Sequence, residues 1–231
     1  MIWLFKFIVA FVIVLGILVL LMKPLYQQIG STCGFYALIY AVSRVQHINK
    51  KKITRRIITD FINSEESFVG EIFDIEKMME IIHKYFPKIK AQIVCINGIQ
   101  DLNQQLENNY VVYPCNYKGT PHYYFLEASG KSEYIYRHMF FCKRRKMGKE
   151  EFYFQHNNLN EVLEFVWKDY FDQEYKGLNR IYAVIWKIFT YVSDHVLYKT
   201  LDEATKQRKD ILYDKKTEIN MWGKILIIPK F

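Results

Sequence analysis

One of the four cysteines in this sequence stands where a thiolate would be favoured. Cys33 follows Ser31 and Thr32, either of which could cap a helix, and it opens an apolar run of helical length over residues 33–45. The positive end of a helix, with its free backbone N–H groups, stabilises a thiolate. The other cysteines lie in or beside strand-like apolar runs, where a thiol ordinarily behaves as a small hydrophobic side chain. These three are Cys95, Cys115 and Cys142.

The residues before Cys33 offer partners for the same chemistry. Acyl transfer through a cysteine needs hydrogen-bond donors for the oxyanion that develops on the substrate. The side-chain amide of Gln27 and the backbone N–H of Cys33 are the two donors available here. We therefore consider Cys33 a candidate nucleophile with Gln27 in its oxyanion hole.

The spacing of these residues is similar to a known signature. Gln27, Gly30, Cys33, Gly34 and Ala37 follow one another as in the glutamine-to-cysteine signature of papain-like cysteine peptidases. The segment most resembles the bacterial family that removes double-glycine leaders from bacteriocin and peptide-pheromone precursors. The similarity extends over residues 25–141. It implies helices first and an antiparallel sheet second, no metal or organic cofactor, and a catalytic histidine at the start of a strand.

His122 has the position that the resemblance requires. It follows a Gly-Thr-Pro turn and opens an aromatic, apolar run over residues 122–128. His47 lies on the same predicted helix as Cys33, about 20 Å away, and cannot reach it. His83 lies on a helix that ends at Pro87, and the last two histidines, His156 and His195, fall outside the region of similarity. The alternative for His122 is a structural strand histidine.

The third catalytic position departs from the family pattern, which has an Asp or Asn there to orient the base. The corresponding residue is His138, beside Arg137. A hairpin symmetric about Gly130 would place His138 opposite His122 and allow a Cys-His-His arrangement. A turn shifted by one residue would bring Arg137 there and favour an impaired or inactive enzyme. A later loop offers two substitutes, Asn157 and Asn158.

The beginning of the chain predicts a membrane anchor. Residues 2–22 are hydrophobic apart from Lys6 and are followed directly by Lys23. With a snorkelling Lys6 they reach the roughly 20 residues that a bilayer span needs. A cleaved signal peptide is the alternative, but no small-x-small cleavage site precedes Lys23. We expect an uncleaved, single-pass transmembrane helix.

Charge and cysteine usage indicate the surroundings of the remaining chain. The net charge of +8 is concentrated in basic clusters at residues 50–56 and 143–146, which we interpret first as solvated faces and next as sites for anionic lipid headgroups. No nucleic-acid motif accompanies them, so we expect no nucleic-acid partner. The positive-inside rule places the domain on the cytoplasmic face of the membrane. The cysteines lack CxxC pairs and metal-ligand spacing, so neither a zinc site nor a disulfide framework is indicated.

The hydrophobic pattern predicts an α+β chain in three units. The anchor covers residues 1–23, a papain-like peptidase domain residues 24–156, and a helical C-terminal extension residues 157–231. In the domain we expect helices over residues 33–45, 53–62, 71–86 and 100–108, with strands over residues 91–96, 110–115, 122–128 and 133–141. Residues 225–231 are expected to add an edge strand.

Together these features imply a membrane-anchored cysteine peptidase. Cys33 would attack a peptide carbonyl, His122 would take and return the proton, and Gln27 would stabilise the oxyanion. The resemblance implies a secreted peptide precursor, such as a bacteriocin, as substrate and a separate peptide exporter as partner. Two alternatives stay open. One is a cell-wall amidase of NlpC type, which would suit His138 and act outside the membrane, and the other is a non-catalytic papain-like membrane protein.

Overall fold

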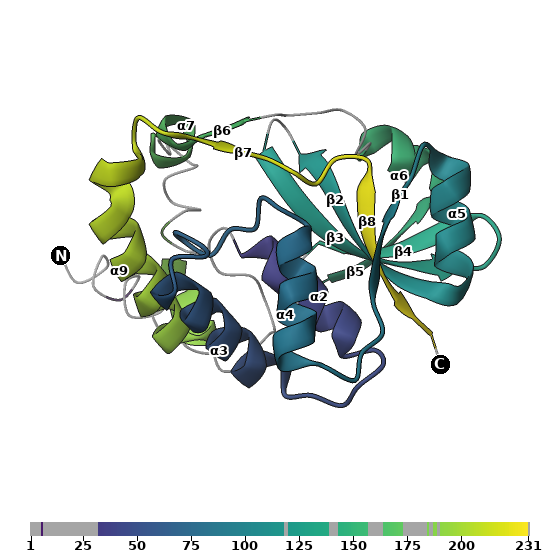
Figure 1. The fold of residues 1–231 in the computed structure, drawn as a ribbon, viewed down its shortest axis with the longest axis horizontal. Helices are drawn as coiled ribbons and strands as arrows, with labels where there is room; N and C mark the ends of the chain where they lie inside the picture. The colour runs from purple at the N-terminus through teal and green to yellow at the C-terminus, as the bar shows by residue number, and fades with distance from the viewer. Residues whose placement is uncertain are drawn as a thin grey trace.

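An antiparallel sheet forms the centre of the fold (Figure 1). The computed structural model describes residues 6, 32–117, 120–138, 143–156, 164–172, 184, 187, 188 and 190–230, and in these ranges the sheet has six strands in the order β1-β8-β2-β3-β4-β5. The strands are β1 (Gln92–Cys95), β2 (Asn109–Tyr117), β3 (Thr120–Ser129), β4 (Glu133–His138), β5 (Lys143–Gly148) and β8 (Lys224–Pro229). The predicted combination of helices with an antiparallel sheet is confirmed.

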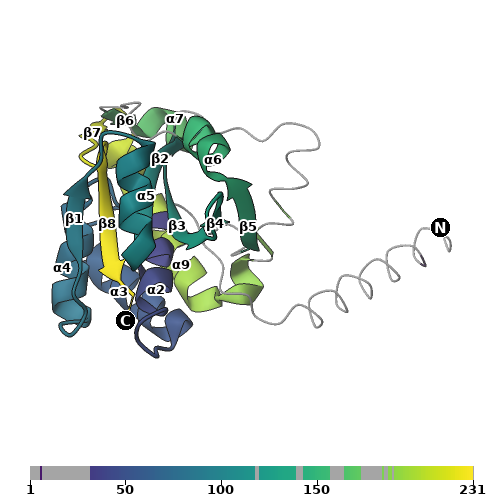
Figure 2. The same cartoon turned by 90° about the vertical axis from the view of Figure 1, so that its right-hand side faces the viewer.

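Helices cover both faces of the sheet (Figure 2). On one face lie α2 (Cys33–Val42), α3 (Lys50–Asn63) and α4 (Glu76–Tyr85), and on the other lie α5 (Ile99–Asn108) and α6 (Lys149–Gln155). Successive side chains of a strand point to opposite faces. In β3, Tyr123 and Phe125 therefore enter the core beside α2, whereas Tyr124 and Leu126 enter the core beside α5 and α6.

Helix α2 is buried along almost its whole length. Its sequence, CGFYALIYAV, is apolar on every side, which is typical of a helix enclosed by other elements. Thr32 occupies its N-cap position but makes no side-chain capping hydrogen bond, and it was one of two expected capping residues. Ser31 lies outside the described residues.

The C-terminal part of the chain belongs to the same body. It contains α7 (Trp167–Phe171), α9 (His195–Leu212) and a small sheet of β6 (Glu164–Val166) and β7 (Lys216–Glu218). Strand β8 pairs with both β1 and β2, so the prediction of an edge strand is wrong. The four consecutive apolar residues 225–228 are all buried, which is typical of a strand covered on both faces. The central sheet thus takes strands from both sides of residue 156.

The two basic clusters have different structural roles. Residues 50–56 form the first half of α3, and residues 143–146 form most of β5, at an edge of the six-stranded sheet. Arg144, Arg145 and Lys146 are exposed there. Charged side chains on an edge strand oppose pairing with another chain, so the second cluster protects the sheet edge.

The predicted membrane anchor, residues 1–23, lies outside the described residues except for Lys6. Among the helices that the structure does describe, none has both the length and the apolar character needed to cross a membrane.

Candidate active site

Cys33 is the first residue of α2 and lies against strand β3. Its side chain is buried, with 7% of its surface exposed. The backbone N–H groups of Tyr123, Gly34 and Cys33 itself act on its sulfur and favour the thiolate. Tyr123 directly follows His122 in β3. The Cys33 sulfur therefore lies beside the backbone of the residue that follows the predicted base.

Burial has a larger effect on this thiol than the helix N-terminus has. It raises the pKa of Cys33 from an ordinary value of 9.0 to about 11, even though the three backbone N–H groups lower it. The pKa of Cys115 is raised as well, first by burial and then by the nearby charge of Cys33. The expectation that the helix start alone would favour the thiolate is wrong, because desolvation of the charged form dominates.

Gly34 allows α2 to approach the sheet closely. A Cβ atom at this position would lie 3.1 Å from Cδ1 of Ile72, 3.2 Å from Cε of Met78 and 3.2 Å from Cδ2 of Tyr123. A larger residue after the cysteine would push the helix start away from β3. Close packing therefore explains why a glycine follows the cysteine in this fold.

Gly70 packs closely against Thr32, the residue before Cys33 in the chain. Its φ of +91° is one that glycine adopts readily. A Cβ atom there would lie 2.5 Å from Cγ2 of Thr32 and 2.9 Å from Cδ2 of Leu201 in α9. The loop before α4, the start of α2 and α9 therefore meet at one point beside Cys33.

A buried carboxylate shapes the loop that carries Gly70. Glu71 accepts hydrogen bonds from the backbone N–H groups of Phe68 and Val69, both at 2.7 Å, and from the hydroxyl of Ser67 at 3.2 Å. Burial raises the pKa of Glu71. The sequence predicted a helix from residue 71, but Glu71 closes this loop instead, so α4 begins at Glu76.

Arg208 of α9 holds the same loop from outside. Its guanidinium donates to the carbonyl oxygens of Ile62 at 2.9 Å, Ser67 at 3.2 Å and Phe68 at 2.5 Å. These bonds link α9 to the end of α3 and to the loop around Glu71. This contact could not be predicted from the sequence, because about 140 residues separate the partners.

His122 lies on the other side of β3 from Cys33. It pairs with Cys115 of β2 across the sheet, and its ring meets Tyr124 edge to face, with 4.9 Å between the centroids. Strand alternation directs Tyr123 toward α2 and His122 away from it. Among the described residues, the groups that act on the Cys33 sulfur are the three backbone N–H groups, not the His122 imidazole. The structure thus places the Cys33 sulfur beside the backbone of Tyr123, while the His122 side chain lies on the opposite face of the strand.

The hairpin register differs from the prediction by two residues. His138 pairs with Tyr124, and Arg137 pairs with Phe125, so neither stands opposite His122. The turn is centred on residue 131 and not on Gly130, which has a φ of +69°. His138 occupies a position diagonal to His122, and such neighbours in a sheet are roughly 7–8 Å apart. The other predicted site residues, Gln27, Asn157 and Asn158, lie outside the described residues.

His156 is a histidine near the candidate site that falls outside the region of sequence similarity. It follows α6, is buried, and places its ring 4.8 Å from that of Tyr124, measured between centroids. Tyr124 therefore contacts both His122 and His156. The one available signal was the alternation of aromatic residues in β3 and β4, which predicts an aromatic face but not the helix that brings His156 to it.

The described residues offer no metal site of their own. Within the ranges given above, no group of three or more His, Cys, Asp or Glu side chains is arranged to hold a metal ion.

Comparison with known proteins identified two similar solved structures. One is the peptidase domain of Streptococcus mutans ComA in complex with a small-molecule inhibitor, with 18% identity, a TM-score of 0.38, and coverage of 58% of this chain and 92% of that chain. The other is the peptidase domain of Streptococcus ComA, a bi-functional ABC transporter involved in a quorum-sensing pathway, with 20% identity, a TM-score of 0.42, and coverage of 58% and 91%. No family model and no curated protein matches the sequence. Both neighbours are peptidase domains.

Proposed function

We propose that this chain is a membrane-anchored cysteine peptidase in which Cys33 is the nucleophile and His122 the base. The observation that supports this proposal most strongly is the position of Cys33. It is the first residue of a buried helix, and the backbone N–H of Tyr123, the residue after His122, acts on its sulfur. The close contacts at Gly34 and Gly70 hold the sulfur at this point.

The protonation state of Cys33 defines the first step. With a pKa of about 11 the thiol keeps its proton near neutral pH, so attack on a carbonyl requires a base. His122 takes this proton after the beginning of β3 shifts to bring the imidazole from Tyr124 toward Cys33, since catalytic contacts often tighten only when substrate is bound. The thiolate then adds to the peptide carbonyl carbon, and the resulting imidazolium protonates the leaving amine. Water activated by His122 finally hydrolyses the thioester and restores the thiol.

Two further residues complete the proposed site. The backbone N–H of Cys33 and the amide of Gln27 stabilise the oxyanion during both steps. His138 orients His122 from its diagonal position in β4. Gln27 belongs to the proposal on the strength of its spacing from Cys33 in the sequence.

The substrate and surroundings follow from the sequence resemblance. We propose that the peptidase removes the leader of a secreted peptide precursor such as a bacteriocin. Residues 1–23 anchor it in the membrane with the catalytic domain on the cytoplasmic face, where a separate exporter receives the product.

Cleavage of a leader peptide tests the proposal. The full chain in detergent is incubated with synthetic precursors that contain a Gly-Gly leader, and the products are identified by mass spectrometry. Cys33→Ala and His122→Ala should each abolish cleavage, while Cys95→Ala should retain it, because Cys95 is exposed on β1 at the sheet edge. Cleavage by Cys33→Ala at the rate of the unmodified chain would refute the assignment.

A non-catalytic papain-like protein is the second candidate function. Burial of Cys33, its raised pKa and the orientation of His122 toward Tyr124 all favour it. It predicts that no precursor is cleaved and that Cys33 stays unreactive toward electrophilic peptides. The two candidates therefore differ in one measurable property, covalent modification of Cys33 by a bound peptide.

A further inference from the structure

A row of apolar side chains is exposed before and within the first turn of α9. Its members are between 40% and 54% exposed: Val184, Ile188, Tyr191, Val192 and Val196. The first four follow the spacing of one face of a helix. Contiguous exposed apolar surface of this kind marks a contact site, whereas single apolar residues at a surface do not.

The opposite side of this segment is fixed to the body of the protein. Asp194 is buried, accepts a hydrogen bond from the backbone N–H of Leu197, and forms an ion pair with Arg55 of α3 at 2.8 Å. Lys51 of α3 donates to the carbonyl oxygen of Ser193. These contacts fix the orientation of the segment, so that the apolar row faces away from the core beside α2.

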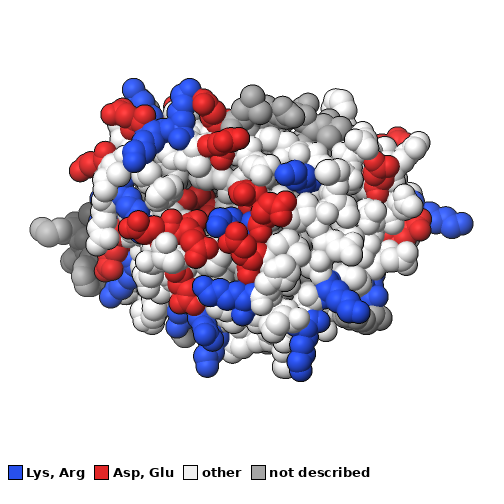
Figure 3. All heavy atoms as spheres, in the orientation of Figure 1, with Lys and Arg blue, Asp and Glu red and all other residues white. Residues whose placement is uncertain are grey.

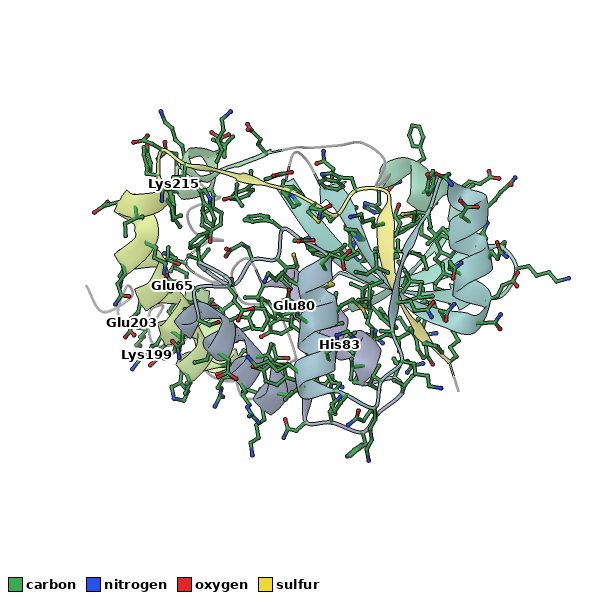
Figure 4. The ribbon with its side chains drawn as sticks, in the orientation of Figure 1. Glu65, Glu80, His83, Lys199, Glu203 and Lys215 are labelled. Carbon is green, nitrogen blue, oxygen red and sulfur yellow. The ribbon has the colours of Figure 1, made fainter. Side chains whose placement is uncertain are left out.

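The exposed charged residues between positions 184 and 199 are basic. Lys187, His195 and Lys199 are exposed in the same segment, and the one acidic residue between positions 184 and 199 is the buried, paired Asp194. Figure 4 shows Lys199 at the lower end of α9, close to α3, which carries the basic cluster of residues 50–56. Figure 3 shows Asp and Glu gathered at the middle of the same view, while Lys and Arg project from its lower edge. An apolar row bordered by lysines matches a surface of anionic lipids.

The predicted anchor would bring a membrane within reach of this row. Residues 23–32 connect the hydrophobic segment to Thr32, and ten residues span at most about 35 Å. Thr32 packs beside Gly70, where a Cβ atom would also meet Leu201 of α9. The chain that leaves the anchor therefore enters the folded body beside α9, about one turn after Val196.

We propose that the apolar row and its lysines form a second membrane contact, which lays this edge of the protein on a bilayer that contains anionic lipids. This inference rests on the membrane anchor of the proposed function, which brings the row near the bilayer. It adds an interfacial surface that fixes the orientation of the domain on the membrane. Cys33 would then face substrate at a set distance from the membrane.

Photocrosslinking of the full chain in vesicles tests this contact. The photoreactive residue p-benzoylphenylalanine replaces Tyr191 in one variant and Phe154 in a control, because Phe154 is the most exposed of the aromatic side chains described, at 88%, and lies in α6. In vesicles of phosphatidylcholine with phosphatidylglycerol, position 191 should give at least fivefold more lipid adduct than position 154. The excess should fall when phosphatidylglycerol is omitted. Equal yields at the two positions, or an adduct with a second copy of the chain, would overturn the contact.

Flotation of the same vesicles separates this inference from the anchor. A chain that floats but gives no excess adduct at position 191 contradicts the contact alone, and a chain that fails to float contradicts both the anchor and the contact. Val192→Glu should lower the adduct yield at position 191, whereas Ile211→Glu should leave it unchanged. Both residues are exposed, at 51% and 62%, so both variants should fold. An equal effect of the two substitutions would also count against the proposal.

Discussion

The two sides of strand β3 hold the proposed catalytic residues in different ways. On the side of α2, backbone N–H groups act on Cys33, and Gly34 and Gly70 leave almost no space around the start of the helix. On the side of α6, His122 and His156 both lie against the ring of Tyr124. The surroundings of the nucleophile are thus set by the backbone, whereas those of the base are contacts between aromatic rings. Substitutions on the first side should alter stability, and those on the second should alter rate.

Gly70→Ala should have the largest effect on stability. The new Cβ atom would lie 2.5 Å from Thr32 at a φ of +91°, so strain from overpacking adds to the cost of the left-handed conformation. We expect the free energy of unfolding to fall by about 3 kcal/mol. Urea unfolding of the full chain in detergent, followed by tryptophan fluorescence, measures the change.

Gly130→Ala is the matched control for that substitution. Gly130 also has a positive φ, +69°, but a Cβ atom there would meet nothing within 4 Å. It should therefore cost only the conformational part, about 1 kcal/mol. Equal losses at positions 70 and 130 would mean that the contact with Thr32 contributes nothing.

Thiol reactivity distinguishes the buried from the exposed cysteines. Because the pKa of Cys33 is about 11 instead of 9.0, its thiolate fraction near neutral pH falls about 100-fold. Iodoacetamide should therefore modify the exposed Cys95 before Cys33 in the absence of substrate, and modification of Cys33 should accelerate as pH rises toward about 11. Peptide mapping over a pH series gives both rates. Rapid modification of Cys33 at pH 7 would instead indicate a thiolate already paired with an imidazolium.

Substitution of His138 should have a smaller effect than the changes predicted for Gly70 and Cys33. An orienting residue adjusts the base without transferring the proton, so we expect His138→Ala to lower kcat/KM by roughly tenfold, which is about 1.4 kcal/mol of barrier. His138→Asn should retain more activity than His138→Ala, and His122→Ala should abolish turnover. The leader-peptide assay provides the rates. If His138→Ala is fully active, the orienting residue lies elsewhere, and Asn157 and Asn158 are the next to test.

Local sequence patterns predicted several elements closely. The helix expected over residues 100–108 is Ile99–Asn108, the one expected over residues 53–62 is Lys50–Asn63, and the strand expected over residues 110–115 is Asn109–Tyr117. Each has a clear hydrophobic period and nearby residues that end it. Cys33 at a helix start and His122 at the beginning of a strand could be predicted for the same reason.

The features that the sequence did not predict depend on distant contacts. The apolar run of β8 indicates a buried strand, but only its pairing with β1 and β2 decides that it lies inside the sheet. The pKa of Cys33 depends on burial under elements far along the chain, while its helix position alone suggested the opposite shift. The hairpin register depends on which residue is at the centre of the turn. The centre is residue 131 and not Gly130, and this shift of one residue moves every cross-strand partner by two positions.

Trapping the acyl-enzyme tests the central claim, that Cys33 is a nucleophile served by His122, most directly. The full chain is mixed with a leader peptide, quenched in acid within a single turnover, and mapped by mass spectrometry for a thioester. We predict an acyl group on Cys33 in the unmodified chain and none in His122→Ala under the same conditions. Cleavage with an acyl group on another residue, or an equal yield on Cys33 in His122→Ala, would contradict it.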